Sequence, residues 1–308
     1  MAKVELAPVA AALERLCPGA VRLHEPLAKH VSFRIGGPAD ILVLPRTLES
    51  LNAVVAWLYG EGVPFVVLGR GSNVLIADRG IRGVVLKTGR GQEGVTYDGP
   101  HVHAECGVSL PHLSRRTAER GLAGLEFGAG IPGSVGGAVV MNAGAHGCAI
   151  ADVLVSARAR TPGGLTTWTG ADLVLRYRHS RLQDEPGVVL DCELMLRPAS
   201  AAETVARLDE WLRTRAESQP LGPPSSGCIF QNPDGDYAGR LIDAAGTKGL
   251  RVGGAVVSDR HANYILNTGG ATARDVLALI GQVQARVHDH AGRDLATEIK
   301  MLGEFEAA

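Results

Sequence analysis

Apolar residues recur with helical and strand spacing through the first third of the chain. Thr47 is placed to cap a helix and Gly60-Glu61-Gly62 to end it. The apolar positions of this helix share one face: Leu48, Leu51, Val54, Val55 and Leu58. A buried strand is predicted at residues 64–68, and shorter apolar runs follow at residues 74–76 and 84–86. The pattern predicts a small α/β unit.

The middle third shows period-two alternation, which is typical of antiparallel strands. One predicted strand has Val153, Val155, Ala157 and Ala159 on one face. Residues 162–164 supply a turn, and residues 165–168 return as a partner strand. A second strand places alternate apolar residues on one face: Val188, Leu190, Cys192, Leu194 and Leu196.

The last third is predicted to contain two amphipathic helices separated by loops. The first helix covers residues 202–217 and places Val205, Leu208 and Leu212 on one face. The proline-containing segment 219–227 follows as a linker or shaped loop. Thr272 is placed to cap the second helix, whose core face is formed by Val276, Leu279, Ile280, Val283 and Val287.

Composition indicates an ordinary globular protein. Its 308 residues fit about two domains, or three small ones. Thirty-one basic and 32 acidic side chains leave a net charge of −1, so charge predicts no nucleic-acid or membrane-surface partner. No apolar run is long enough to predict a membrane span. The five cysteines, an odd number without a C-x-x-C pair, predict reduced thiols and a cytoplasmic location.

Glycine is the exception, at 40 of 308 residues. Residues 69–73 follow the predicted strand as Gly-Arg-Gly-Ser-Asn, a pattern that suits either an anion nest or a tight connection between strands. From Gly121 to Gly147, nine of 27 residues are glycine, which predicts a loop moulded around a ligand. Two such loops could hold the two ends of one diphosphate ligand.

Two other patterns do not support a binding site. Gly128-Ala129-Gly130-Ile131-Pro132-Gly133 matches G-x-G-x-x-G, but the sequence indicates neither a preceding strand nor a following helix, which argues against a Rossmann site. The pairs His101/His103 and His288/His290 lack an acidic or cysteine ligand at metal spacing. No metal site is therefore predicted.

Three polar residues have apolar or glycine-rich neighbours: Arg178, Cys228 and Glu298. Each one alone is more often a structural residue than a catalyst. Together they would supply a cation, a weak acid and a carboxylate, a set that suits the formation of a transient enolate. The pattern by itself does not place them in one site.

These segments, in this order, resemble the UDP-N-acetylenolpyruvoylglucosamine reductase (MurB) family of flavoenzymes. The matching segments span nearly the whole chain: residues 32–40, 68–75, 130–147, 177–180, 225–233, 253–263 and 295–303. The resemblance implies an α+β protein with a two-subdomain FAD-binding fold of the vanillyl-alcohol-oxidase type and a C-terminal α/β substrate-binding domain. The implied boundaries are residues 1–88 and 89–198 for the FAD-binding subdomains and residues 199–308 for the substrate-binding domain. The short run between Asp191 and Ala202 leaves no room for the insertion of longer members, so the chain resembles the shorter type.

The resemblance also implies ligands and their contacts. FAD is expected to bind non-covalently, since no histidine lies in residues 69–73, and NADPH is the expected co-substrate of a monomeric enzyme. Tyr177 and Asn232 are implied as substrate contacts. The implied FAD contacts are Arg34, Gly69, Arg70, Gly71, Ser72, Asn73, Gly133, Ser134, Gly136, Gly137, Asn142 and Gly144.

The reaction implied by the resemblance is the reduction of UDP-N-acetylglucosamine enolpyruvate to UDP-N-acetylmuramate for peptidoglycan synthesis. Arg178 and Glu298 match the residues that polarise the enolpyruvyl carboxylate, and Cys228 matches the proton donor. Serine is common at the donor position, but a thiol with a pKa near ~8.5 is a stronger acid than an alcohol and keeps the role. Ser218 occupies the position of a lysine that often contacts the diphosphate, which puts that contact in doubt.

Two other classes of protein remain open. A flavin-dependent oxidase of the same fold would often tether its flavin through histidine, which residues 69–73 lack, and would leave the motif around Cys228 without a role. A nucleotide-sugar binding protein that had lost catalysis would be expected to have lost part of the Arg178, Cys228 and Glu298 set, which is intact.

Overall fold

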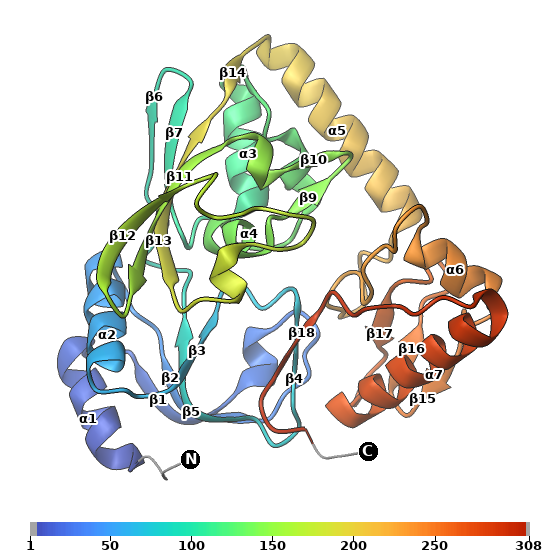
Figure 1. The fold of residues 1–308 in the computed structure, drawn as a ribbon, viewed down its shortest axis with the longest axis horizontal. Coiled ribbons are helices and arrows are strands. Elements are labelled where there is room, and N and C mark those ends of the chain that lie inside the picture. The colour runs from blue at the N-terminus through green and yellow to red at the C-terminus, as the bar shows by residue number, and fades with distance from the viewer. Residues whose placement is uncertain (1–4, 306–308) are drawn as a thin grey trace. The chain divides into compact units, whose positions relative to one another are not determined.

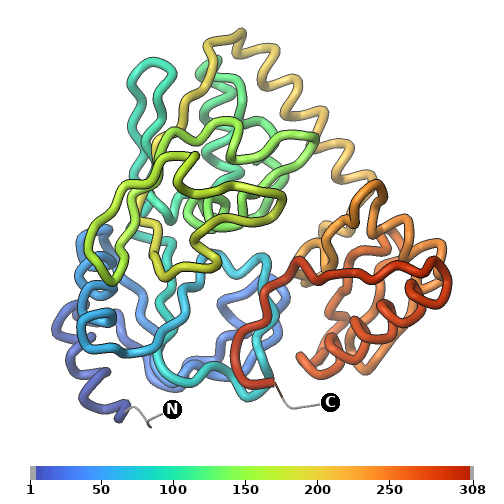
Figure 2. The backbone as a smooth tube through the Cα atoms, in the orientation of Figure 1, coloured from blue at the N-terminus to red at the C-terminus, as the bar shows by residue number. Residues whose placement is uncertain are grey.

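The computed structural model describes residues 5–305, and the chain folds into two compact units (Figure 1). Unit 1 consists of Met1–Leu23, Ile41–Arg70 and Gly83–Arg215. Unit 2 consists of His24–Asp40, Gly71–Arg82 and Ala216–Ala308. The chain thus passes between the units repeatedly, a path that can be followed by colour in Figure 2. Each unit has a hydrophobic core of its own.

Unit 1 contains most of the regular structure. Its helices are α1 (Leu6–Leu16), α2 (Leu48–Gly60), α3 (Leu110–Glu119), α4 (Val135–Met141) and most of α5 (Ala201–Ser218), with short 3₁₀ turns η2 (Glu126–Gly130), η3 (Ile150–Asp152) and η4 (Arg181–Gln183). Its strands are β3 (Phe65–Leu68), β6 (Val95–Asp98), β7 (His101–Glu105), β8 (Leu122–Ala123), β9 (Gly144–Ala145), β10 (Cys148–Ala149), β11 (Leu154–Thr161), β12 (Gly164–Thr169), β13 (Val188–Met195) and β14 (Arg197–Pro198). Three strands are divided between the units: β1 (Val21–Pro26), β2 (Pro38–Val43) and β5 (Ile81–Lys87).

The predicted α/β unit of the first third is confirmed except for the run at residues 74–76, which forms a strand in unit 2 and pairs with residues 300–302. The Thr47 hydroxyl accepts a hydrogen bond from the Ser50 amide at 3.0 Å and so caps α2. The helix buries the face formed by Leu51, Val54, Val55 and Leu58. Strand β3 pairs in parallel with β5, within a sheet of order β1-β2-β5-β3. Because both strands run the same way, the residues that follow them lie at the same edge of the sheet.

The predicted antiparallel sheet is also confirmed, with the strand order β12-β11-β13-β7-β6. One detail of the prediction is wrong, because Val155 does not share a face with the buried Ala157. The pairing of β11 with β13 shifts between Leu154 and Ser156, and this irregularity leaves Val155 36% exposed while Leu154 is buried. Strand β13 is buried at consecutive positions, which shows that both faces of the sheet are covered there.

The prediction of a loop throughout residues 121–147 is wrong, since this stretch contains α4. The Ser134 hydroxyl caps the helix by accepting a hydrogen bond from the Gly137 amide at 3.4 Å. Gly136 lies so close to Cys106 that a Cβ atom on it would lie 2.8 Å from the Cys106 Cβ. Glycine in this helix therefore reflects close packing rather than a lack of structure, and α4 ends at Asn142, whose φ is 40°.

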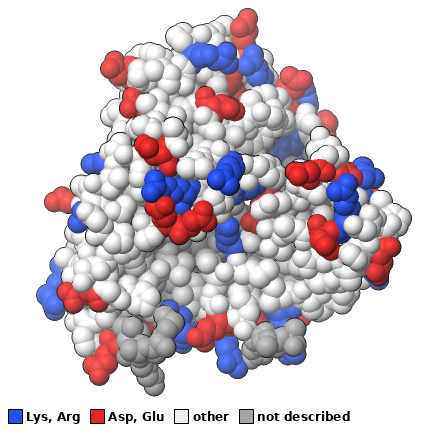
Figure 3. Space-filling model, viewed as in Figure 1, with Lys and Arg blue, Asp and Glu red and all other residues white. Residues whose placement is uncertain are grey.

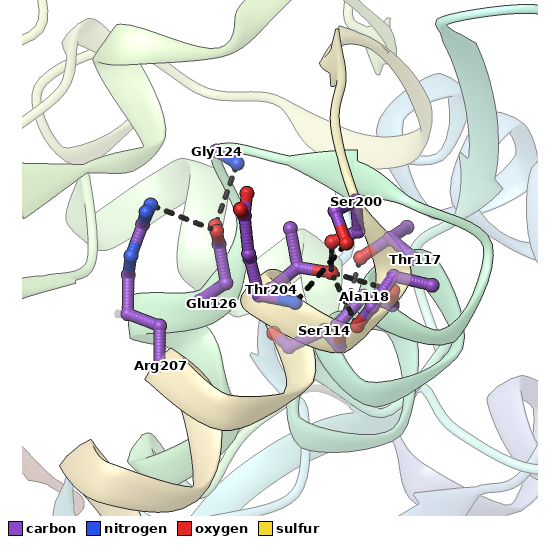
Figure 4. A network of polar contacts seen from close by, with 10 residues as sticks. Ser114, Thr117, Ala118, Gly124, Glu126, Ser200, Thr204 and Arg207 are labelled. Atoms are coloured by element: carbon purple, nitrogen blue, oxygen red, sulfur yellow. Dashed lines mark hydrogen bonds and ion pairs between the residues drawn. The ribbon is translucent and has the colours of Figure 1, made fainter.

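Helix α5 packs through part of the predicted face. Leu208 is buried as predicted, whereas Val205 and Leu212 are only half-buried. Thr204 is buried as well, and its hydroxyl donates to the Ala118 carbonyl at the end of α3 at 2.7 Å. One turn later, Arg207 approaches Glu126 at 3.3 Å (Figure 4). Glu126 is only 3% exposed, and its other oxygen accepts the Gly124 amide hydrogen at 2.6 Å. Polar contacts thus replace part of the expected apolar seam.

Unit 2 is built around its longest helix. Its elements are η1 (Leu27–His30), β4 (Val74–Ile76), α6 (Ala238–Ala244), β15 (Arg251–Val252), β16 (Ala255–Val257), β17 (Ile265–Asn267), α7 (Ala273–Ala291) and β18 (Lys300–Leu302). The prediction for α7 is confirmed, with the Thr272 cap and the buried face in place. The Asp78 carboxylate also accepts the amide hydrogens of Ala273 and Arg274, at 2.8 and 3.1 Å.

The surface carries charges of both signs. On the face shown in Figure 3, basic and acidic side chains are interspersed, in line with the net charge of −1. Within residues 5–305, no helix combines the length and the apolar character needed to cross a bilayer.

Candidate active site

The predicted site residues are divided between the two units. Unit 1 contains Gly69, Arg70, the segment from Gly133 to Gly144, Tyr177 and Arg178. Unit 2 contains Arg34, the segment from Gly71 to Asn73, Cys228, Asn232 and Glu298. The loop of residues 69–73 therefore belongs to both units, which meet in the chain between Arg70 and Gly71.

In unit 1, the first glycine-rich loop lies against the start of the second. A Cβ atom on Gly69 would lie 2.9 Å from the Ser134 hydroxyl, so the absence of a side chain lets these two segments touch. Ser134 is 2% exposed and begins α4. Arg70 extends to the surface, where it approaches Glu93 at 3.3 Å. The structure thus brings together two loops that lie 65 positions apart, 69 and 134, in the chain.

The other end of α4 holds the turn that carries Arg178. The buried Asn142 side chain donates to the Arg176 carbonyl at 2.8 Å and accepts from the Ala151 amide at 2.9 Å. Ser180 donates to the Val140 carbonyl at 2.7 Å. Because α4 has seven residues, the two ends lie about 10 Å apart, the length that such a helix spans. Asn142 therefore acts here on the backbone that positions Arg178.

The turn itself is tight and leaves its side chains accessible. The Arg176 and His179 backbones exchange two hydrogen bonds, of 3.0 and 3.1 Å. Arg178 has a φ of 54°, an uncommon conformation for arginine, and Gln183 donates to its carbonyl at 3.0 Å. Tyr177 is 52% exposed, with the Arg178 guanidinium 5.1 Å from its ring centre. This arrangement presents a forked cation beside an aromatic ring.

In unit 2, the second half of the first loop is held by Ser32. The Ser32 amide donates to the Gly71 carbonyl at 3.0 Å, and its hydroxyl donates to the Ser225 carbonyl at 2.7 Å. Gly71 has a φ of 68°, and a Cβ atom on it would lie 2.6 Å from the His30 carbonyl oxygen. Arg34, two residues after Ser32, is exposed and has a φ of 55°. The sequence gives no signal for this function of Ser32 beyond its place in a matching segment.

Cys228 and Glu298 lie on adjacent segments. The Glu298 amide donates to the Ile229 carbonyl at 2.7 Å, and the Gln231 amide donates to the Ala296 carbonyl at 2.9 Å. The Cys228 backbone bridges to Tyr264 on its other side. Cys228 and Glu298 are both partly exposed, and their backbone segments lie side by side in unit 2.

Two asparagines hold the Cys228 segment, and only one was predicted as a site residue. The buried Asn263 side chain accepts from the Phe230 amide at 2.9 Å and donates to its carbonyl at 2.8 Å. Asn232 accepts the Ala238 amide hydrogen at 3.0 Å, at the start of α6. The Asn232 side chain therefore has a structural contact as well as its predicted contact with substrate.

Glycine at three of the predicted cofactor positions is required by the protein itself. The close neighbours are the His30 carbonyl for Gly71, Cys106 for Gly136 and the Cys148 carbonyl for Gly144, where a Cβ atom would lie 2.4 Å from the oxygen. These contacts account for glycine without a bound ligand. The chemistry of the neighbouring side chains is the better indicator of what the loops bind.

Lys87 is a candidate that the sequence analysis missed. It lies at the carboxyl end of β5, opposite Leu68 of β3, and its Nζ donates to the Gly69 carbonyl at 3.2 Å. Burial, and to a smaller extent the charge of Arg70, lower the pKa of Lys87 from its usual value to about 8. A desolvated cation beside a glycine-rich loop at the carboxyl edge of parallel strands fits an anionic group such as a diphosphate. Strand pairing decides this position, so the local sequence pattern could not reveal it.

The histidine pair His101/His103 has acidic partners that the sequence did not reveal. His101 approaches Glu193 at 2.6 Å and His103 approaches Asp191 at 3.2 Å, because β7 pairs with β13. Asp191 is also paired with Arg158. No group of three or more residues arranged to hold a metal ion occurs in the described part of the chain. The contacts are cross-strand pairs of an imidazole and a carboxylate on the sheet.

Comparisons with known proteins identify related chains. Residues 39–170 match the family described as "FAD binding domain". Residues 219–302 match the family described as "UDP-N-acetylenolpyruvoylglucosamine reductase, C-terminal domain". A UDP-N-acetylenolpyruvoylglucosamine reductase of Syntrophomonas wolfei is 43% identical over 290 residues, which cover 94% of this chain and 97% of the relative. The Bacillus licheniformis reductase is 44% identical over 294 residues, with 95% and 97% covered.

A solved structure agrees with these relatives. The crystal structure of the reductase MurB from Thermus caldophilus superposes with a TM-score of 0.79 at 37% identity, covering 92% of this chain and 99% of that one. Together with the two matching domains, this similarity confirms the expected α+β fold, with an FAD-binding region followed by a C-terminal domain.

The lowered pKa of Lys87 predicts a pH dependence of stability in the flavin-free protein. Between about pH 8 and the ordinary lysine pKa, the unfolded state binds a proton at Lys87 that the folded state has lost, so stability rises with pH. From pH 8 to 9.5, we expect the free energy of unfolding of the parent to rise by about 1–2 kcal/mol more than that of Lys87→Met. Urea unfolding followed by circular dichroism measures the difference. The exposed Lys29→Met is the control, and equal pH slopes for the parent and Lys87→Met would contradict the prediction.

Proposed function

Because this chain belongs to the UDP-N-acetylenolpyruvoylglucosamine reductase family, we propose that it reduces UDP-N-acetylglucosamine enolpyruvate to UDP-N-acetylmuramate, with bound FAD and with NADPH as reductant. The observation that carries the proposal is the relationship over more than nine-tenths of the chain, at 43% and 44% identity. The adjacency of Cys228 and Glu298 in unit 2 supports it. A flavin-dependent oxidase of the same fold would leave this adjacency without a function.

The side chains near the loop of residues 69–73 and near α4 have the charge and the hydrogen-bonding groups that a flavin nucleotide requires. Lys87 and Arg70 supply positive charge beside Gly69, and Ser72 and Ser134 supply hydroxyl groups. We assign FAD contacts to these residues and to Arg34, Gly71, Asn73, Gly133, Gly136, Gly137, Asn142 and Gly144. When bound, FAD supplies the hydride that it has received from NADPH. The protein contributes charge, orientation and a proton.

Arg178 is assigned to the carboxylate of the enolpyruvyl group. A guanidinium can donate two parallel hydrogen bonds to a carboxylate, and it stabilises the negative charge that develops on an adjoining enolate. The backbone of the Arg178 turn is held by Asn142, Ser180 and Gln183. Tyr177, exposed beside it, is assigned to substrate as well.

Cys228 is assigned as the general acid. After hydride addition to the vinyl methylene carbon, the carbon alpha to the carboxylate carries the electron pair, and the Cys228 thiol gives it a proton and becomes a thiolate. Glu298, on the adjacent segment, is assigned with Arg178 to the polarisation of the enolpyruvyl group. Asn232 is assigned to substrate binding. No contact with the substrate diphosphate is assigned to Ser218, so other residues would have to make that contact.

The wider organisation follows from the same proposal. Residues 1–88 and 89–198 form the FAD-binding subdomains and residues 199–308 the substrate-binding domain. The enzyme acts as a monomer in the cytoplasm, where the five cysteines remain reduced thiols.

The first expectation is that the purified protein is yellow and that its FAD is not covalently bound. The loops offer hydrogen-bond donors and cations but no histidine tether within residues 69–73. Precipitation with trichloroacetic acid should release the flavin into the supernatant, where its absorption spectrum identifies it. Yellow colour retained in the pellet would show a covalent bond.

The second expectation concerns Arg178→Lys. Lysine keeps the charge but cannot place two hydrogen bonds on one carboxylate, so reoxidation of the flavin by substrate should slow by about 10–100-fold. Stopped-flow absorbance at the flavin band measures this half-reaction. The exposed Arg197→Lys serves as the matched control. Reoxidation of Arg178→Lys at the parental rate would remove Arg178 from the catalytic set.

The third expectation separates the two half-reactions at Cys228. A positioned general acid is worth roughly 10²–10⁴-fold, so Cys228→Ala should lose about that factor in substrate reduction. NADPH should still reduce its flavin at the parental rate, because that step needs no acid at Cys228. Cys228→Ser should recover much of the activity, since a hydroxyl can also donate a proton. If alanine is tolerated, or serine is no better than alanine, Cys228 is only a small structural side chain.

A further inference from the structure

Asn73 is hydrogen-bonded to the backbone of Glu298 and of Lys300. Its side-chain amide donates to the Glu298 carbonyl at 3.3 Å, and its own carbonyl accepts the Lys300 amide hydrogen at 3.0 Å. The two segments then continue as the parallel pair β4 and β18, in which Val74 lies opposite Lys300. All of these residues belong to unit 2.

The Glu298 backbone is consequently held from two directions. Its amide hydrogen is bonded to the Ile229 carbonyl at 2.7 Å, next to Cys228, and its carbonyl accepts from Asn73. These two bonds restrict the rotation of the peptide groups on both sides of the Glu298 Cα. The direction in which the carboxylate leaves the backbone therefore depends on Asn73 as well as on the Cys228 segment.

We infer that Asn73 is a positioning residue for Glu298, and that it couples the loop of residues 69–73 to the carboxylate that acts on substrate. This inference rests on the proposed function, because it takes Glu298 to be the group that must be positioned. The loop that contacts the cofactor and the segment that bears Glu298 are thereby one hydrogen-bonded structure. A displacement of about 1 Å in a catalytic group can cost about 10²-fold in rate, so one lost backbone contact is enough to be measurable.

Two other functions of Asn73 make different predictions. If its side chain only contacted FAD, its removal would weaken FAD binding and leave the rate of the FAD-saturated enzyme unchanged. If it only stabilised the fold, its effect would be independent of Glu298 and would multiply with that of a Glu298 variant. Residues that act through one another give non-additive effects in a double-mutant cycle.

The experiment is a double-mutant cycle on FAD-saturated enzyme with Asn73→Ala and Glu298→Gln. Reduction by NADPH and reoxidation by the enolpyruvyl substrate are timed separately in the parent, in each single variant and in the double variant. We expect Asn73→Ala to slow reoxidation by about 10–100-fold and by a larger factor than it slows reduction, and to cause no further loss of the reoxidation rate in the Glu298→Gln background.

Asp78→Ala is the matched control, because it loosens the same segment of unit 2 through the start of α7 without contacting Glu298. Its effect should multiply with that of Glu298→Gln. Hydrogen exchange supplies a readout besides activity: in Asn73→Ala, the amides of residues 298–300 should exchange faster than in the parent, whereas those of residues 279–287 in α7 should not.

Three results would overturn the inference. The effects of Asn73→Ala and Glu298→Gln could multiply, or Asn73→Ala could weaken FAD binding while the saturated enzyme reoxidises at the parental rate. Unchanged exchange at residues 298–300 would show that Asn73 does not hold the segment. Parental reoxidation in Glu298→Gln would be a different failure, since it would remove Glu298 from the proposed mechanism, and the inference with it.

Discussion

The parallel pairing of β4 with β18 is the contact on which the organisation of unit 2 depends. It joins segments 225 positions apart, as measured from Asn73 to Glu298, and each segment is too short to be stable as a strand alone. The pairing is supported on both sides, by the Asn73 side chain and by the contacts of Asp78 with α7. Without it, the Gly71–Arg82 segment would lose its strand pairing in unit 2, and the Glu298 backbone would keep its bond to Ile229 but lose the one to Asn73.

In unit 1, the short helix α4 lies between Gly69 and the turn of residues 176–179, which carries Arg178. Its first residues lie next to Gly69, and the asparagine that ends it holds the Arg176 carbonyl. The glycines within and around it permit this close packing, which is why a glycine-rich segment can be rigid rather than flexible.

The proposed reaction develops negative charge beside a carboxylate. A carboxylate next to a growing carbanion requires positive charge, which we assign to Arg178, and a proton, which we assign to Cys228. Lys87 would meet a similar demand at the loop of residues 69–73 in the proposed complex with FAD, because a cation that is costly to bury in the ligand-free protein becomes favourable beside an anion. The function assigned to Cys228 has a disadvantage, since a thiol is more easily oxidised than a serine hydroxyl.

The sequence by itself determined the elements whose signals are local. Each of these elements has its signals within a few residues along the chain, so a linear pattern contains them. They are the cap and apolar face of α2 and of α7, and the alternating apolar residues of β11, β12 and β13. The order of the motifs likewise identified Arg178, Cys228 and Glu298 as candidates. Only the tertiary structure decided that α4 forms in the glycine-rich stretch, that Val155 turns outward, that Lys87 is buried beside Gly69, and that Asn73 holds Glu298. Each of these depends on a partner far away in the chain, and no local pattern of apolar and polar residues encodes which distant segment will be that partner.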